Sequence, residues 1–158
     1  VATAEQADAM ELGKLYAIQT TASTTEGAQY VYCKKLVKNE TGERPLYTGY
    51  HSTVSAFYYG TLIVGDQFDG NFDGYSALDT NIPLSSLKEP TAFDSPTTFA
   101  VASVIPGWTA ALQLMRAGER WMLYIPWQSA YGSSGNNDGT IPGYTALTFD
   151  LLLERIVE

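Results

Sequence analysis

The alternation of apolar and polar residues is clearest at the end of the chain. Every second residue there is apolar, with polar residues between: Leu147, Phe149, Leu151 and Leu153 against Thr148, Asp150 and Glu154. Successive side chains of a strand point to opposite faces, so this period of two predicts a strand with one buried face. Runs rich in β-branched and aromatic residues predict further strands within 30–32, 52–64, 99–104 and 120–127.

One segment has a clear helical period. Four apolar residues fall at i, i+3, i+4 and i+7: Trp108, Ala111, Leu112 and Met115. This spacing places them on one face of a short helix, and Gly118 follows as its C-terminal stop. The apolar face requires a cover, which we expect the strands to provide.

The first residues also have a helical pattern. Thr3 and Gln6 have the spacing of a capping box. Three apolar residues then recur at i, i+3 and i+4: Leu12, Leu15 and Tyr16. Residues 20–27 are small and polar, which is typical of a linker. We therefore expect an N-terminal helical extension and linker over 1–27, followed by the main domain over 28–158.

The stretch 70–96 has no regular period. Glycine and proline interrupt it throughout: Gly70, Gly74, Pro83, Pro90 and Pro96. We expect a long loop or insertion, a feature that is unusual in a compact domain and often functional. The pattern as a whole predicts an α+β fold of several antiparallel strands, one short central helix and an N-terminal helix.

The net charge of the chain limits the classes of molecule that it can bind. The formal net charge is −8 and the sequence has no basic patch, so the chain repels phosphates and nucleic acid is a poor partner. Solubility is the simplest role for this charge. No apolar stretch approaches the ~18–20 residues that a membrane helix needs. The sequence begins at Val1 instead of Met, which fits either removal of a signal segment or trimming.

The chain lacks the residues that several kinds of functional site require. Cys33 is the only cysteine and His51 the only histidine, which excludes an internal disulfide, a zinc site built on their spacing and a His-based catalytic triad. We expect Cys33 to be a buried, inert thiol in a strand and His51 to be a surface residue. No nucleotide-binding motif is present, so the sequence indicates neither a cofactor nor a metal.

Acidic residues gather in two glycine-rich stretches. The first contains Asp66, Asp69 and Asp73, and the second is Asn136-Asn137-Asp138-Gly139. Calcium prefers such oxygen-rich loops, but neither stretch has the EF-hand spacing. We favour turn formation over cation binding for both.

Seven short motifs occur in one order along the chain: Tyr58-Tyr59-Gly60-Thr61-Leu62 with Gly65 and Phe68-Asp69, Val104-Ile105-Pro106-Gly107-Trp108, Leu114-Met115-Arg116-Ala117-Gly118-Glu119-Arg120, Ile125-Pro126, Ser129-Ala130-Tyr131-Gly132, Ile141-Pro142 and Leu147-Thr148-Phe149-Asp150. Together they resemble the FKBP-type peptidyl-prolyl cis-trans isomerase family, especially its bacterial envelope members. The resemblance covers roughly 28–158. It implies an antiparallel sheet curled as a half-barrel around one short helix, which agrees with the fold class inferred from the pattern.

The resemblance also implies a pocket for a proline-containing peptide. Its catalytic residues would be Tyr58, Asp69, Ile105, Trp108 and Tyr131. Its other substrate-binding walls would be Phe68, Phe99, Val104, Ile141 and Phe149. Trp108 would form the floor under the proline ring. The Ile105 amide and the Tyr131 hydroxyl would bind the peptide, and Asp69 would orient it without transferring a proton.

The sequence departs from the family pattern at three places. Thr97 stands where many members have a second aromatic residue. The loop between Tyr131 and Ile141 is one residue longer. The segment 70–96 is longer than in minimal members, and its aromatic residues are candidates to fold back toward the pocket: Phe72, Tyr75 and Phe93.

The resemblance predicts an enzyme that accelerates rotation about X-Pro bonds during protein folding. Rotation faces a barrier of ~18–20 kcal/mol but breaks no bond, so it needs no nucleophile or strong base. This agrees with the missing triad. Proline-containing polypeptides are the implied partners, with macrolide inhibitors as a further ligand class. The implied location is the bacterial cell envelope, periplasmic or lipid-anchored, with the cytoplasm as the alternative.

Two other functions stay open at this point. The first is a non-catalytic peptide-binding or chaperone module on the same fold, which Thr97 and the long 70–96 segment motivate. A carbohydrate-binding surface is motivated only by the abundance of aromatic residues, 11 Tyr and 3 Trp.

Overall fold

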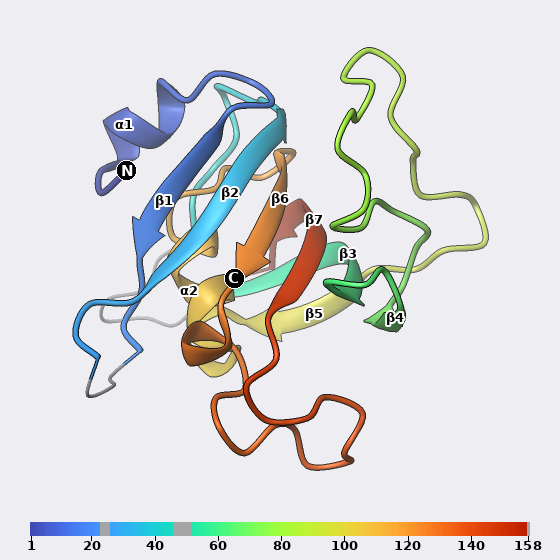
Figure 1. Ribbon diagram of the computed structural model, residues 1–158. Helices are drawn as coiled ribbons and strands as arrows, with labels where there is room; N and C mark the ends of the chain where they lie inside the picture. The colour runs from blue at the N-terminus through green and yellow to red at the C-terminus, as the bar shows by residue number, and fades with distance from the viewer. Residues whose placement is uncertain (23–25, 46–51, 158) are drawn as a thin grey trace.

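The computed structural model describes residues 1–22, 26–45 and 52–157 (Figure 1). In chain order its elements are α1 (Ala4–Asp8), β1 (Leu15–Gln19), β2 (Tyr30–Val37), β3 (Thr53–Leu62), β4 (Gln67–Gly70), β5 (Thr97–Ala100), the 3₁₀ turn η1 (Val101–Ser103), α2 (Pro106–Leu112), β6 (Arg120–Ile125), the 3₁₀ turn η2 (Trp127–Ser129) and β7 (Leu147–Ile156). The strands form one seven-stranded antiparallel sheet in the order β1-β2-β6-β7-β3-β4, with β5 also paired to β3. The α+β class is confirmed.

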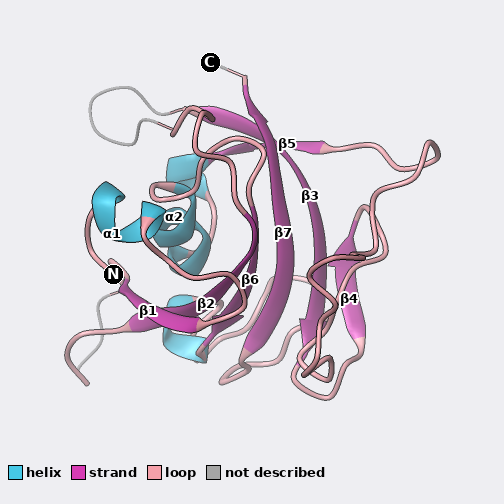
Figure 2. Ribbon diagram, turned by 90° about the horizontal axis from the view of Figure 1, so that it is seen from above, coloured by secondary structure: helices cyan, strands magenta, loops and turns pink. Residues whose placement is uncertain are grey.

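The sheet curls around α2, whose residues Gly107 to Leu112 are all buried. Seen from above, the sheet separates the helices from the long irregular segment that precedes β5 (Figure 2). Pro106 starts the helix, where its missing N–H costs nothing. A Cβ on Gly107 would lie 2.8 Å from the side chain of Ile125, so only glycine lets the helix approach β6 this closely. The Thr109 hydroxyl donates to the Val101 carbonyl at 2.7 Å and joins η1 to α2.

The predicted alternation in β7 is confirmed on its inner face. The four apolar residues are buried there: Leu147, Phe149, Leu151 and Leu153. The outer face differs from a solvated face, because Thr148 and Asp150 are buried as well. The irregular residues 71–96, expected as a loop, contain no strand or helix and pack partly over this face.

The expected helix over Leu12 to Tyr16 is wrong. The capping box of Thr3 and Gln6 is present and starts α1, but Leu15–Gln19 forms β1, which pairs with β2. Gly13 has φ +77°, a left-handed conformation that interrupts any helix. Three apolar residues are too few to separate a helix from a strand, and the free edge of β2 supplies the hydrogen bonds that decide it. This part of 1–27 therefore belongs to the sheet.

Other expectations had mixed outcomes. Cys33 is fully buried in β2, as expected. The strand β4 was not predicted, and the strand expected over 99–104 ends at Ala100 and turns into η1. His51 lies outside the described residues.

Candidate active site

A cavity of about 230 Å³ lies between α2 and the strands β3, β4 and β5. Nine of the ten predicted site residues line it: Tyr58, Phe68, Asp69, Phe99, Val104, Ile105, Trp108, Tyr131 and Phe149. Sequence positions 58 to 149 are thus brought together by the curl of the sheet around one helix. Ser103 also lines the cavity and was missed, since a serine before Val104 has no distinctive pattern.

Trp108 is the centre of this cavity and is 3% exposed. Three rings meet its indole edge to face. Their centroids lie 4.9 Å away for Phe99, 5.2 Å for Phe149 and 5.4 Å for Tyr58. Such edge-to-face pairs are favourable and hold each ring in one orientation. The indole N–H has no hydrogen-bond partner within the part of the chain that the structure describes. The result is a rigid apolar floor with one unused donor.

Gly60 in β3 allows two of the aromatic walls to meet. Phe68 and Phe149 are in edge-to-face contact with centroids 5.5 Å apart. A Cβ on Gly60 would lie 2.8 Å from each of these rings. Real Cβ atoms do not approach so closely, so a side chain at this position would move a wall of the cavity.

Polar groups occur on one side of the cavity. The Tyr58 hydroxyl is hydrogen-bonded to the Asp69 carboxylate. Burial raises the pKa of Tyr58, and the bond to Asp69 raises it further. Burial also raises the pKa of Tyr131, and the charges of Asp69 and Asp138 add to the effect. Both hydroxyls therefore stay protonated at neutral pH and can donate hydrogen bonds.

The main chain at the start of α2 contributes a further donor. The Ile105 carbonyl accepts from the N–H groups of Trp108 and Thr109, at 3.0 and 3.1 Å, which fixes this peptide unit. No acceptor contacts the Ile105 N–H in ranges 1–22, 26–45 and 52–157. An N–H group without an intrahelical partner at the start of a helix commonly donates to a side chain, water or ligand.

Ile141 does not line the cavity, although it was predicted to do so. It is 1% exposed and packs within the main core. Its N–H donates to the Asn136 side chain at 2.8 Å, and its carbonyl accepts from the Asn136 N–H at 3.0 Å. Ile141 therefore anchors the loop between Tyr131 and β7.

The departures from the family pattern leave the cavity intact. Thr97 is exposed, and its hydroxyl accepts from the Asn71 side chain at 3.0 Å. None of the three candidate aromatic residues of 70–96 lines the cavity. Phe72 and Tyr75 are buried on the outer face of the sheet, and Phe93 is 98% exposed. The rings of Phe72 and Tyr75 lie there against the buried guanidinium of Arg120 in β6.

Comparison with known proteins agrees with this geometry. The sequence profile described as "FKBP-type peptidyl-prolyl cis-trans isomerase" matches residues 48–154. The chain belongs to the FKBP-type peptidyl-prolyl cis-trans isomerase family. This FKBP chain is 34% identical over 134 residues to FkpA of Aeromonas hydrophila, which covers 85% of the chain and 40% of FkpA.

Two further relatives are similar. The outer membrane protein MIP of Legionella longbeachae is 40% identical over 106 residues, covering 67% of the FKBP chain and 34% of MIP. A crystal structure of a peptidyl-prolyl cis-trans isomerase from Pseudomonas syringae matches with a TM-score of 0.60 at 27% identity, covering 88% and 81% of the two chains. The FKBP chain thus spans well under two thirds of the length of these curated relatives.

No group of three or more potential ligands able to hold a metal ion occurs among the residues that the structure describes. Asp69 instead accepts from the Gly70 N–H at 2.8 Å, as in a turn. None of the described helices is both long and apolar enough to cross a membrane.

Proposed function

We propose that this FKBP chain accelerates cis-trans rotation about X-Pro peptide bonds. The supporting observation is the cavity around Trp108, an apolar, aromatic pocket with separate hydrogen-bond donors beside it. The ring of a proline would lie against the indole. The Ile105 N–H and the Tyr131 hydroxyl would bind carbonyl groups of the same peptide.

The reaction needs a pocket of this kind because of how the amide changes. Rotation breaks amide resonance, which is the origin of the ~18–20 kcal/mol barrier. The twisted amide has less charge on its oxygen, so an apolar surrounding favours it over the planar amide. Only interactions that are stronger in the transition state raise the rate. An acceleration of about a thousandfold requires about 4 kcal/mol, which a few such contacts can supply.

Tyr58 and Asp69 have a positioning role in this proposal. Their hydrogen bond holds the Tyr58 ring edge-on to Trp108 and directs the carboxylate to one side of the pocket. No step transfers a proton, which fits a site without histidine. Phe68, Phe99, Val104 and Phe149 shape the walls against which the peptide packs.

The partners and the location follow from the same family. Proline-containing polypeptides are the substrates, and macrolide inhibitors that imitate a bound proline are a further ligand class. We place the chain in the cell envelope, periplasmic or lipid-anchored. The similarity to the outer membrane protein MIP of Legionella longbeachae supports this placement.

A proline-limited refolding assay tests the proposal. We expect Trp108→Ala to lower kcat/KM at least about tenfold and Tyr131→Phe several-fold, because each removes a contact to the twisted peptide. Tyr30→Phe is the matched control, since Tyr30 is a half-exposed tyrosine that does not line the pocket. Unchanged catalysis in a Trp108→Ala/Tyr131→Phe double variant would exclude this site. Binding of an unfolded chain without any acceleration would instead favour the non-catalytic module.

A further inference from the structure

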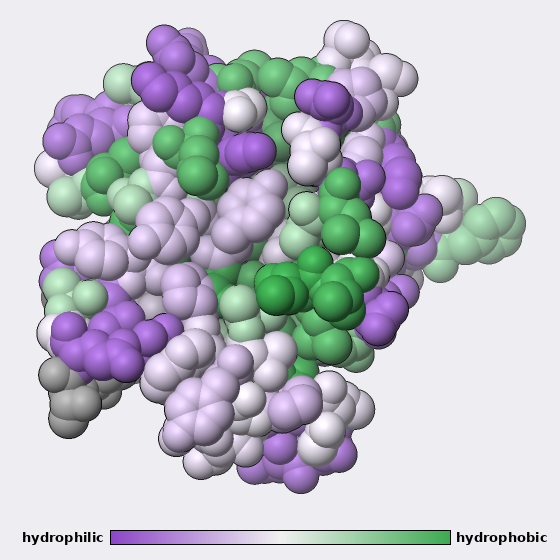
Figure 3. All heavy atoms as spheres, viewed as in Figure 1, coloured by the Kyte–Doolittle hydropathy of each residue, from purple (hydrophilic) through white to green (hydrophobic). Residues whose placement is uncertain are grey.

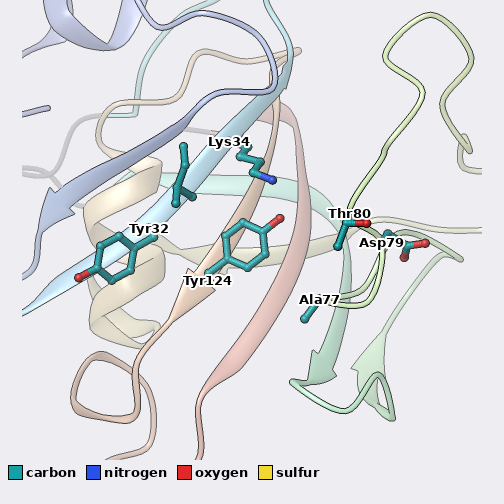
Figure 4. Close-up of a pocket in the computed structure, with 7 residues that line it drawn as sticks. Tyr32, Lys34, Ala77, Asp79, Thr80 and Tyr124 are labelled. Carbon is teal, nitrogen blue, oxygen red and sulfur yellow. The ribbon is translucent and has the colours of Figure 1, made fainter.

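A second cavity, of about 470 Å³, lies on the outer face of the sheet, away from α2 (Figure 4). Tyr32 of β2 and Tyr124 of β6 are direct cross-strand partners and form its floor. Lys34 stands on the β2 side, with its Nζ 5.7 Å from the centre of the Tyr124 ring. Asp79 and Thr80 of the irregular segment form the opposite wall. The segment packs on Met122 of β6 and on Leu36 near the end of β2, while Tyr32 further along β2 stays 40% exposed.

The cavity is the middle of a longer groove, which we call the outer groove. A cavity of about 280 Å³ adjoins it through shared Lys34 and Thr80, and extends to Leu12 and Leu84. A third, of about 270 Å³, adjoins it through shared Tyr32, Tyr124 and Ala77. It ends at Pro126 and Ile63.

The groove follows the length of β6. At ~3.3 Å per residue its six residues span roughly 20 Å, the length of about six extended residues. Figure 3 views this face and shows hydrophobic side chains gathered between β7 and the turn that joins β3 to β4. Exposed apolar residues lie at both ends of the groove, with Leu12 45% and Ile63 60% exposed. A long trough of this size, apolar at its middle and at its Ile63 end, is shaped for a chain and not for a compact ligand.

The charges of the groove restrict its occupant. One cation, Lys34, and one anion, Asp79, face each other across it, so its lining has no net charge. The molecule as a whole has a net charge of −8. This repels polyanions, and it also opposes close packing of a second copy with the same charge. A neutral segment whose carbonyl groups meet Lys34 and whose N–H groups meet Asp79 is complementary to both walls.

The two tyrosines favour a polypeptide over other neutral ligands. Neither hydroxyl has a hydrogen-bond partner among the described residues, and burial, with the charges of Asp150 and Asp79, raises the pKa of Tyr124. The hydroxyls are therefore available as donors beside apolar ring faces. Aromatic grooves of this kind bind extended and polyproline segments, whose backbone carbonyls accept and whose side chains pack on the rings.

We propose that the outer groove binds an extended, uncharged, apolar segment of a polypeptide, on the opposite face of the sheet from the Trp108 pocket. The kind of partner rests on the proposed function, because a protein that isomerises X-Pro bonds meets unfolded chains. A segment bound here retains the chain near the domain while its prolines exchange at the pocket.

Binding of fluorescein-labelled, reduced and carbamidomethylated α-lactalbumin, a permanently unfolded protein whose blocked cysteines carry no added charge, tests the groove by anisotropy. All variants are measured with and without Trp108→Ala, which separates groove binding from pocket binding. We expect Tyr32→Ala to raise the Kd at least about fivefold in both backgrounds. Thr80→Arg, which places a long side chain from the other wall into the groove, has the same effect. Tyr30→Ala is the matched control, because Tyr30 is 39% and Tyr32 40% exposed on the same strand, yet only Tyr32 lines the groove.

The outcomes separate this proposal from the proposed function. Equal Kd values of the Tyr32→Ala and Tyr30→Ala variants for the unfolded probe would overturn the proposal that the outer groove binds polypeptide. This holds even if the variants turn over a tetrapeptide X-Pro substrate normally. A dimer in sedimentation that Tyr32→Ala dissociates, with unchanged probe binding, would assign the groove to a second copy. Binding of chitohexaose in place of the unfolded protein would assign it to carbohydrate. The expected Kd pattern can also appear while neither the parent chain nor any variant turns over the tetrapeptide. That result would support binding in the outer groove and contradict the proposed isomerase function.

Discussion

Arg120 and Asp150 form a bidentate ion pair between neighbouring strands β6 and β7, with N–O distances of 2.8 and 2.7 Å. Their side chains are 1% and 0% exposed. Asp150 also accepts from the Tyr75 N–H at 3.0 Å, and Arg120 donates to the Lys88 carbonyl. The rings of Phe72 and Tyr75 lie 5.2 and 5.5 Å from the guanidinium carbon. This pair therefore holds the irregular segment on the outer face of the sheet.

Asp150→Asn should destabilise the protein by about 3–5 kcal/mol, because it leaves a buried arginine without its counter-charge. Urea unfolding at neutral pH measures the loss. The control is Asp66→Asn at an exposed position, which should change stability by less than about 0.5 kcal/mol. Arg120→Met/Asp150→Leu should lose less than the single variant. A single variant as stable as the parent chain would contradict the role of the pair.

Gly60→Ala should lower activity by displacing the Phe68 and Phe149 rings, each 2.8 Å from the added Cβ. We expect kcat/KM on an X-Pro tetrapeptide to fall at least about tenfold, because small displacements of a binding wall have large effects on rate. Gly139→Ala is the comparison. It adds strain at φ +78° in open space, so it should cost stability but leave kcat/KM unchanged. Equal activities of both variants would show that the wall is not needed.

The N-terminal helix should make stability depend on acid pH. Hydrogen bonds from Arg116 and Arg44 hold the pKa of Asp8 well below its ordinary value of 3.8. A depressed carboxyl pKa stabilises the folded state above the unfolded pKa, and this contribution is lost as pH falls through the folded pKa. Asp8→Asn should therefore cost about 1 kcal/mol at neutral pH, a modest value because the pair is partly exposed.

Thermal unfolding at several pH values checks this expectation. The Tm difference between the parent chain and Asp8→Asn should be largest near neutral pH and should shrink below about pH 4. A difference that is constant down to about pH 2 would contradict the ionic origin.

Charged peptides should report the electrostatics of the pocket. The charges of Asp69 and Asp138 both act on Tyr131, and none of the described residues that line the cavity is basic. Tetrapeptides with Lys before proline should thus have a several-fold higher kcat/KM than those with Glu, and the ratio should decrease as salt screens the charges. Asp138→Asn should reduce the ratio without changing turnover of a neutral peptide. A ratio independent of salt would contradict this account.

Cys33 should not react with iodoacetamide in the folded protein. Burial raises its thiol pKa to about 12, so the reactive thiolate is nearly absent at neutral pH. Mass spectrometry should find no modification without denaturant and complete modification in urea. Rapid alkylation of the folded chain would show that β2 opens readily.

Local sequence patterns were sufficient where one element determines its own structure. The capping box of Thr3 and Gln6 starts α1 as predicted, because both partners are three residues apart. The inner face of β7 follows from its alternation. The motifs that resemble the family also located most of the pocket, because nine of the ten residues taken from them line the cavity.

Other features depend on contacts between distant residues, which no local pattern contains. Leu15 lies in a strand because the edge of β2 offers it hydrogen bonds. Ile141 leaves the pocket because Asn136 holds its main chain elsewhere. The sequence by itself determined the strand alternation, the central helix and the residue types of the pocket. Only the tertiary structure decided that Asp150 is buried, that Phe72 and Tyr75 lie away from the pocket and that the outer groove stays open. The reason is that a buried charge recruits partners from any part of the chain, and burial is known only once the chain has folded.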